Sequence, residues 1–288
     1  MSDAAAAHKE KEHAQRLVRA YAQLVVVMRD ALARLGRQEP YRTTAVRRAM
    51  QHVFEEALER EGLLVALARL PRGPDAVAQR LAAVSAYCLA MTRRLLLSPR
   101  DSVDLCVSAL FHDLSRLPGE PMPPSAFGVR SLVRVSADVL TPEVMHQSAT
   151  ALEWDAPAKS APPTARFIAV ASLFELLTQP APGRPGIAVN DVMGLLGQLG
   201  GSRLDENVVR LFTHTVGFYP PGTAVQLSDG TSAVVKRPPL EEHPLDQPLV
   251  RRYDKAFAPV ETQVGSEPGL VVRGAIPPTL NPLRAWLE

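Results

Sequence analysis

The 288-residue sequence lacks a strong net charge, long apolar runs and more than two cysteines. A formal charge of +2 gives no reason to expect binding of a nucleic-acid polymer, which needs basic residues gathered on one face. Cys88 and Cys106 lie in apolar stretches, so buried reduced thiols are expected rather than a disulfide or a metal pair. The apolar runs are too short to span a bilayer, and the first residues lack the order of a signal peptide. We therefore expect a cytoplasmic protein that makes no use of a membrane.

Common catalytic motifs are missing as well. The glycines of residues 196–204 come without a lysine and without a strand-to-helix context, so they do not form a phosphate-binding loop. No local pattern of serine, histidine and aspartate, or of cysteine and histidine, favours nucleophilic catalysis. The remaining candidate for chemistry is the pair His112-Asp113.

Helical periodicity is what the sequence has in abundance. Apolar residues recur every three or four positions from Leu17 to Leu35, and Gly36 is a suitable end for that helix. A second helix is predicted from about Thr43, and the sequence PRGP at 71–74 breaks the pattern. Further helices are predicted at about 75–97, 98–112, 129–140, 142–152, 164–178, 190–199 and 205–216.

Beyond Tyr219 the pattern changes from helix to strand. Apolar and polar residues alternate on both sides of Asp229-Gly230, which predicts a β-hairpin with a tight turn. The residues that follow are rich in proline and contain one more strand candidate, at 270–273. The prediction is a mainly α protein in three parts, namely an N-terminal helical region, a helical domain and a C-terminal β-hairpin with a proline-rich tail (1–74, 75–216 and 217–288).

The segment at 105–118, LCVSALFHDLSRLP, contains an apolar helix that ends in His112-Asp113. Histidine and aspartate both bind divalent metal ions. On its own, the pair is a weak signal, and ordinary hydrogen bonds at a helix end explain it more simply. Three further segments accompany it, which are AVASLFELLT at 169–178, LDENVVRLFTHTVGFYPPGTAVQLSDGTSAVV at 204–235 and GAIPPTLNPLRAWL at 274–287.

In order and spacing, these four segments resemble the HD-GYP branch of the HD superfamily of phosphohydrolases, from about Leu63 to the end. The first is similar to a leucine-rich helix ending in His-Asp-x-Gly-Lys, and the second to a later helix ending in Asp-x-Phe-Asp-Ala-Leu-Thr. The third is similar to a closing helix with a Tyr-Pro-x-Gly-Thr hairpin, and the last to the tail of some members. The resemblance implies an HD-domain-like helical bundle with an N-terminal helical extension and a small β appendage.

Active members of this family hold two or three divalent ions, of the iron or manganese type, between histidines and aspartates. The metals activate a water that attacks a phosphodiester, usually in cyclic di-GMP. Carried over onto this chain, the resemblance keeps two of seven ligand positions, His112 and Asp113. The other five fall on residues that do not suit a metal, which are Arg80, Pro124, Thr150, Ala151 and Ser172. Since a metal site needs three or four protein ligands, we expect neither a bound metal nor catalytic residues.

Arg80 also brings a positive charge to a position where the family has a histidine. At a separation of ~4 Å and an effective dielectric constant of ~20, a guanidinium would repel a metal ion by roughly 4 kcal/mol per unit of ionic charge. Without a metal, Asp113 needs another cationic partner if it is buried. We therefore predict an ion pair between Asp113 and either Arg80 or Arg116.

The sequence thus predicts a catalytically inactive HD-GYP-like pseudoenzyme that acts as a signalling or scaffold module in bacteria, through partner proteins. One alternative is a metal-free module that binds cyclic di-GMP or another nucleotide, with Arg80, Arg116 and Arg184 facing phosphate oxygens. A second alternative is a residual metal-dependent phosphodiesterase with one ion on His112 and Asp113. The N-terminal helices either pack on the core or mediate a homodimer, and the sequence leaves both open.

Overall fold

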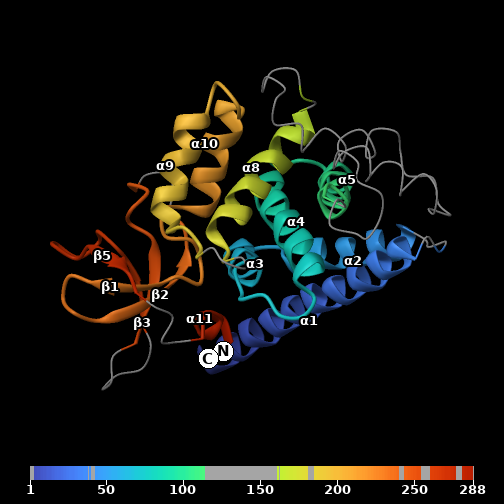
Figure 1. Cartoon of the computed structure of the whole chain (residues 1–288). Helices are drawn as coiled ribbons and strands as arrows, with labels where there is room; N and C mark the ends of the chain where they lie inside the picture. Colours follow the sequence, from blue (N-terminus) through green and yellow to red (C-terminus); the bar gives the residue numbers. More distant parts are fainter. Residues whose placement is uncertain are drawn as a thin grey trace.

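A helical body and a five-stranded antiparallel sheet make up the protein in this computed structural model (Figure 1). The structure describes residues 3–37, 39, 43–113, 161, 163–180, 185–239, 243–253, 260–276 and 281–287. Within these residues the helices are α1 Asp3–Gly36, α2 Thr43–Glu56, α3 Glu61–Ala68, α4 Ala76–Arg94, α5 Pro99–Leu110, α8 Pro163–Thr178, α9 Val189–Leu199, α10 Glu206–Val216 and α11 Arg284–Leu287. The strands are β1 Ala224–Leu227, β2 Ser232–Arg237, β3 Leu249–Tyr253, β4 Val260–Gln263 and β5 Val272–Ala275.

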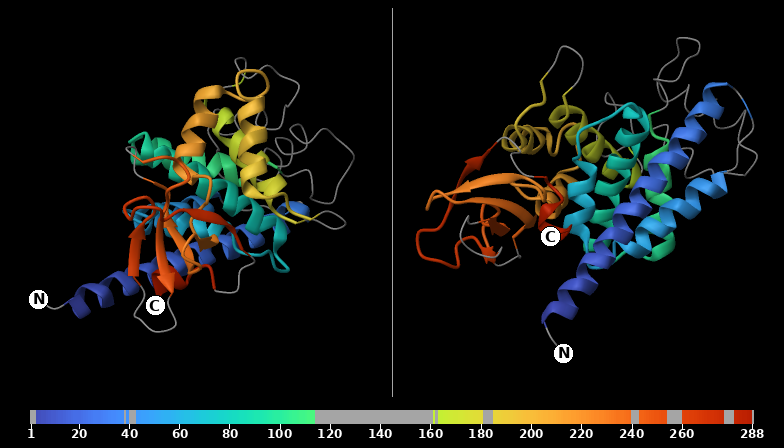
Figure 2. Two further views of the ribbon diagram at one scale, coloured as in Figure 1. Left: turned by 90° about the vertical axis from the view of Figure 1, so that its left-hand side faces the viewer. Right: turned by 90° about the horizontal axis from the view of Figure 1, so that it is seen from below.

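The long N-terminal helix α1 runs along one side of the body, and its first turns project past it (Figure 2). Its apolar face is buried against α2 and α4, including Leu17, Leu24, Met28 and Leu35. The same hydrophobic core continues through the other helices as far as Trp286. The apolar face of α1 is therefore covered by the helices of its own chain.

Helix α4 is at the centre of the helical body. It packs against α1, α3, α5, α8 and α10, and every residue from Arg80 to Thr92 is buried. A helix surrounded on all sides must be apolar all round, which explains its many alanines. Arg80 is the one charged residue among the buried residues of α4.

Helices α5 and α10 each begin at a side chain that caps the helix. The Ser98 hydroxyl accepts a hydrogen bond from the Asp101 amide at 3.1 Å, and Asp205 caps α10 in the same manner. Helix α3 was not predicted as a separate element, since the break before it contains neither glycine nor proline. The break before α3 occurs where Glu59 adopts a left-handed φ of 62°. The helices predicted at 129–140 and 142–152 lie outside the described residues.

The sheet has the strand order β4-β3-β2-β1-β5. The predicted hairpin is confirmed as β1 and β2, and Gly230 has a φ of 84° at its turn. The predicted strand at 270–273 is shifted to β5 at Val272–Ala275. Strands β3 and β4 were missed because their sequences, LVRRY and VETQ, do not alternate clearly between apolar and polar residues.

Close backbone contacts join the sheet to the helical body. A Cβ on Gly62 of α3 would lie 2.2 Å from the Lys236 carbonyl oxygen of β2, so only glycine fits there. Next to α3, the Arg69 guanidinium donates to the carbonyl oxygens of Pro220 and Pro221, both at 3.3 Å. The sheet is therefore fixed in place by the segment that precedes α4.

The expectation for the two cysteines is confirmed. Cys88 and Cys106 are both buried and free. Burial raises the pKa of the Cys106 thiol to about 12, so it stays protonated. In the part of the chain that the structure describes, no helix combines the length and apolar character needed to cross a membrane.

Candidate functional site

The residues singled out on α4, on α8 and just after α5 meet in the interior of the helical body. Arg80 lies near the start of α4, and His112-Asp113 follows directly after α5. Ser172 lies on α8, which packs against α4. These four residues are separated by up to 92 positions in sequence, yet all four are buried and together form one polar cluster.

The Arg80 guanidinium is the centre of this cluster. Its Nε donates to Glu175 Oε2 at 3.0 Å, and its Nη2 donates to Ser172 Oγ at 3.3 Å. Its Nη1 forms an ion pair with Asp113 Oδ2. The ion pair predicted for Asp113 is thereby confirmed, with Arg80 as the cation. Each nitrogen of the guanidinium has an acceptor, which fixes the orientation of the side chain.

Glu175 connects this ion pair to a second arginine. One carboxylate oxygen accepts from Arg80, and the other forms an ion pair with Arg72 from the loop before α4. The Glu175 side chain is 1% exposed, so its charge is removed from water almost completely. Two arginines and two carboxylates leave the cluster with no net charge, which satisfies the requirement that buried charges be paired.

His112 completes the cluster in its neutral form. Its Nδ1 lies 2.7 Å from the Ala109 carbonyl oxygen, which only accepts, so Nδ1 carries the proton. Its Nε2 lies 3.0 Å from Ser172 Oγ and accepts from that hydroxyl, since Arg80 donates to the same oxygen. Burial, and then the charge of Arg80, lower the pKa of His112 to about 4. Both ring nitrogens are therefore engaged at neutral pH.

The cluster has the geometry of an internal salt-bridge network. The acceptors that face its centre, on Asp113, Glu175 and Ser172, are directed at the Arg80 guanidinium. Over the described ranges, no three histidine, cysteine, aspartate or glutamate side chains are arranged to hold a metal ion. The charges of this cluster therefore satisfy one another inside the protein.

Several residues named from the sequence lie outside the described residues. These are Arg116, Pro124, Thr150, Ala151 and Arg184. The nucleotide-binding alternative relied on Arg80 as well as on Arg116 and Arg184. The Arg80 side chain is 5% exposed and is bonded to two carboxylates, so it offers phosphate no accessible face in this structure.

Sequence reasoning missed Glu175 and Arg72. A signal for Glu175 was present, because it is the one acidic residue in the apolar stretch AVASLFELLT. It also stands at the second aspartate position of the motif to which that stretch was compared. Arg72 was read only as part of a helix-breaking loop, and its ion pair depends on contacts that no local pattern reveals.

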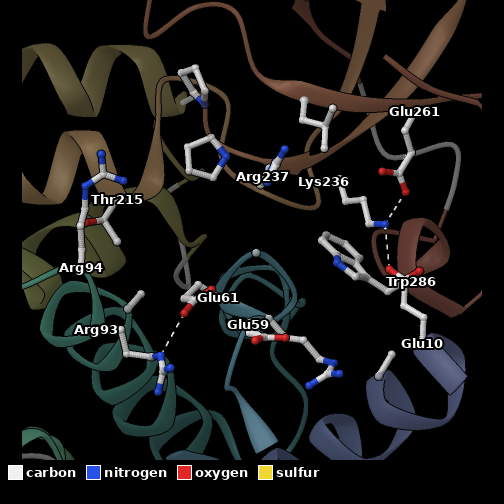
Figure 3. Close-up of a pocket in the computed structure, with 17 residues that line it drawn as sticks. Glu10, Glu59, Glu61, Arg93, Arg94, Thr215, Lys236, Arg237, Glu261 and Trp286 are labelled. Atoms are coloured by element: carbon white, nitrogen blue, oxygen red, sulfur yellow. Dashed lines mark hydrogen bonds and ion pairs between the residues drawn. The ribbon is translucent and has the colours of Figure 1, made fainter. Parts of the chain in front are cut away.

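A separate cavity of about 640 Å³ lies where the helical body meets the sheet (Figure 3). Its walls carry charges of both signs, several of them paired with each other. Lys236 Nζ lies 3.0 Å from Glu10 and also pairs with Glu261, while Arg93 Nε lies 2.9 Å from Glu61. None of the residues named from the sequence as ligand positions lines this cavity.

The fold and the cluster together define a mostly helical protein with a C-terminal five-stranded antiparallel sheet and a buried, charge-balanced centre. No family model matches the chain, and no curated protein is detectably similar to it. Its function must therefore be argued from the residues and their geometry.

Proposed function

We propose that the chain is a catalytically inactive HD-GYP-like protein that acts as a signalling or scaffold module through contacts with other proteins. The observation that carries this proposal is the position of Arg80 between Asp113, Glu175 and Ser172. The resemblance assigns Arg80 and Ser172 to lost ligand positions and His112-Asp113 to retained ones. Their convergence in one cluster is what a shared ancestry with metal-binding members would produce.

The charge balance of the cluster argues against a metal. A divalent ion beside Asp113 would meet the Arg80 guanidinium, at a cost of roughly 4 kcal/mol for each unit of ionic charge. Displacing Arg80 instead would leave its own buried charge without Asp113 and Glu175. His112 would also have to give up a hydrogen bond before its nitrogen could reach a metal. The residual phosphodiesterase is therefore the least supported of the three hypotheses.

The nucleotide-binding alternative stays a prediction that rests on Arg116 and Arg184. No contact of the described residues favours it, because Arg80 is enclosed. Among the described residues, the arginine at the centre of the cluster is engaged by carboxylates, so contacts through the outer surface are better supported. This reasoning favours protein contacts over ligand chemistry.

The first experiment measures metal and activity together. The protein is purified in the presence of Mn²⁺ and Fe²⁺, its metal content is determined by mass spectrometry, and hydrolysis of cyclic di-GMP is assayed. We expect far less than one metal ion per chain and no hydrolysis. Stoichiometric metal with turnover would overturn the proposal.

A second experiment separates scaffold from nucleotide-binding module. Cyclic di-GMP is titrated calorimetrically into the full chain and into an Arg184→Ala variant. No heat of binding is expected for either protein. Binding that Arg184→Ala weakens would establish the nucleotide-binding alternative in place of the scaffold. A protein partner is then sought by pull-down and verified with the purified partner.

A further inference from the structure

The cavity between the helical body and the sheet is lined by side chains from both parts (Figure 3). Helix α4 contributes Arg93, strand β2 contributes Lys236 and Arg237, and helix α11 contributes Trp286. A volume of about 640 Å³ is within the range of pockets that hold small organic molecules. The cavity is therefore large enough for a ligand that contacts the helical body and the sheet at once.

The basic and acidic side chains of this cavity differ in their exposure to solvent. Lys236 is 13% exposed, while its two partners, Glu10 and Glu261, are 59% and 43% exposed. Arg93 is 17% exposed, and its partner Glu61 is 42% exposed. The cations are thus enclosed in the wall, and the carboxylates that pair with them lie nearer the solvent.

This difference in exposure decides which charge a ligand carries. Five basic and four acidic residues line the cavity, so the balance of charge alone does not choose between an anion and a cation. A cationic ligand that took Glu10 and Glu261 would leave the enclosed Lys236 without its partners, which is costly. An anionic ligand would only return exposed carboxylates to water, and such carboxylates gain little from their ion pairs. The cavity therefore favours an anion.

Two arginines of the cavity keep hydrogen-bond donors available for this anion. Arg93 uses its Nε for Glu61, and its Cζ lies 5.3 Å from the centre of the Phe54 ring, which restrains the guanidinium. Its terminal nitrogens, Nη1 and Nη2, donate to no group in the described part of the chain. Arg237 is exposed and forms no ion pair with any described residue. These nitrogens can donate to a ligand without breaking a contact.

The number of cations favours phosphate over carboxylate as the anionic group. A phosphate monoester carries about two negative charges near neutral pH and offers three oxygens, whereas a carboxylate carries one charge. Arginine meets phosphate oxygens through paired hydrogen bonds, and lysine meets them as a point charge. Trp286 and Pro238 add apolar surface to the same cavity, which suits an organic group attached to the phosphate.

We infer that this cavity binds a small organic phosphate monoester, with its phosphate at Arg93, Lys236 and Arg237. The organic part lies against Trp286, and the exposed glutamates give way to the phosphate when it binds. The inference goes beyond the proposed function and does not depend on it, because no residue of the cluster around Arg80 lines this cavity.

Calorimetric titration with phenyl phosphate tests the site, because this probe combines a phosphate monoester with an aromatic ring. We expect saturable binding to the wild-type chain at millimolar concentration or below. Inorganic phosphate, which lacks the ring, and benzoate, which carries one charge, should each bind roughly tenfold more weakly. Absence of binding by phenyl phosphate would overturn the site, and equally tight binding of either other probe would overturn the class of ligand.

Two substitutions should move the affinity for phenyl phosphate in opposite directions. Arg237→Ser removes a donor to the phosphate, so the dissociation constant should rise by roughly tenfold. Its midpoint of thermal unfolding should stay unchanged, because this side chain pairs with no described residue. Glu10→Gln removes a carboxylate that competes for Lys236, so the dissociation constant should fall by about twofold to fivefold.

Matched controls change the same charges outside the cavity. Arg273→Ser removes an exposed arginine from β5 of the same sheet, and Asp30→Asn removes an exposed carboxylate from α1. Neither control should alter the dissociation constant. Equal weakening by Arg273→Ser would mean that phenyl phosphate responds to net charge alone, which overturns the inference. Unchanged affinity in Arg237→Ser, or weaker binding to Glu10→Gln, would overturn it as well.

Discussion

At its N-terminal end, α4 holds the charged side chain of Arg80 inside the protein, and at its C-terminal end the chain exposes Leu95 and Leu96 to water. Both ends depart from the usual division between apolar interior and polar surface. The buried charges are all accounted for by partners within the chain, on Asp113, Glu175 and Ser172. The side chains of Leu95 and Leu96, by contrast, remain exposed to water in the single chain. The comparison teaches that charges inside this protein are satisfied by one another, whereas the apolar side chains of Leu95 and Leu96 are left facing water.

The largest effect on stability is expected from Glu175→Ala. It removes the carboxylate between Arg80 and Arg72 and leaves the buried charge of Arg80 close to the partly buried charge of Arg72. We expect the free energy of unfolding, measured in urea, to fall by about 4 kcal/mol. The control is Asp30→Ala, which removes an exposed partner of Arg34 and should cost less than about 0.5 kcal/mol. Similar losses in both variants would mean that the cluster is not tightly buried.

The next largest effect concerns pH and His112. The pKa of His112 is lowered to about 4 in the folded protein, from an ordinary value of 6.5. The unfolded chain therefore binds the proton more tightly, and stability is lost as pH falls from 6.5 towards 4. Over this window the loss amounts to about 3 kcal/mol.

The variant that checks this assignment is His112→Gln, studied by urea unfolding at several pH values. Its free energy of unfolding should fall less steeply than that of the wild type below pH 6.5. An unchanged slope would mean that another group is responsible.

A double-mutant cycle tests the ion pair at the centre of the cluster. Arg80→Met should destabilise the protein strongly, because Asp113 then lacks its cation. Arg80→Met combined with Asp113→Asn should be more stable than the sum of the single losses predicts. We expect a coupling free energy of about 2 kcal/mol from chemical unfolding. Additive losses would show that the two side chains do not interact.

The smallest effect is expected at the other end of α4. Leu95→Ser exchanges an exposed apolar side chain for a polar one, so the monomer loses little packing. Its free energy of unfolding, measured at dilute concentration, should stay within about 0.5 kcal/mol of the wild type. A loss as large as that of Arg80→Met would contradict the contrast between the two ends.

Most helices could be predicted from the sequence because one apolar face repeats along α1, α2 and α10. The same method could not reveal which face of α8 is buried, since AVASLFELLT is apolar on nearly every side. Glu175 was overlooked for this reason. The pair of Arg80 and Asp113 was predictable, because a buried carboxylate without a metal requires a cation. The exposure of Leu95 and Leu96 was not predictable, since it depends on where neighbouring helices end.

The short loop before α4 has a mechanical consequence. Arg69 holds the carbonyl oxygens of Pro220 and Pro221 at the start of the sheet, and Arg72 holds Glu175 in the buried cluster. The two arginines are only three positions apart, so about 10 Å of chain links these anchor points. Pro71 lies between them and stiffens the link. A force that displaces the sheet would therefore pull, through Arg69 and the short link, on Arg72 and its ion pair with Glu175.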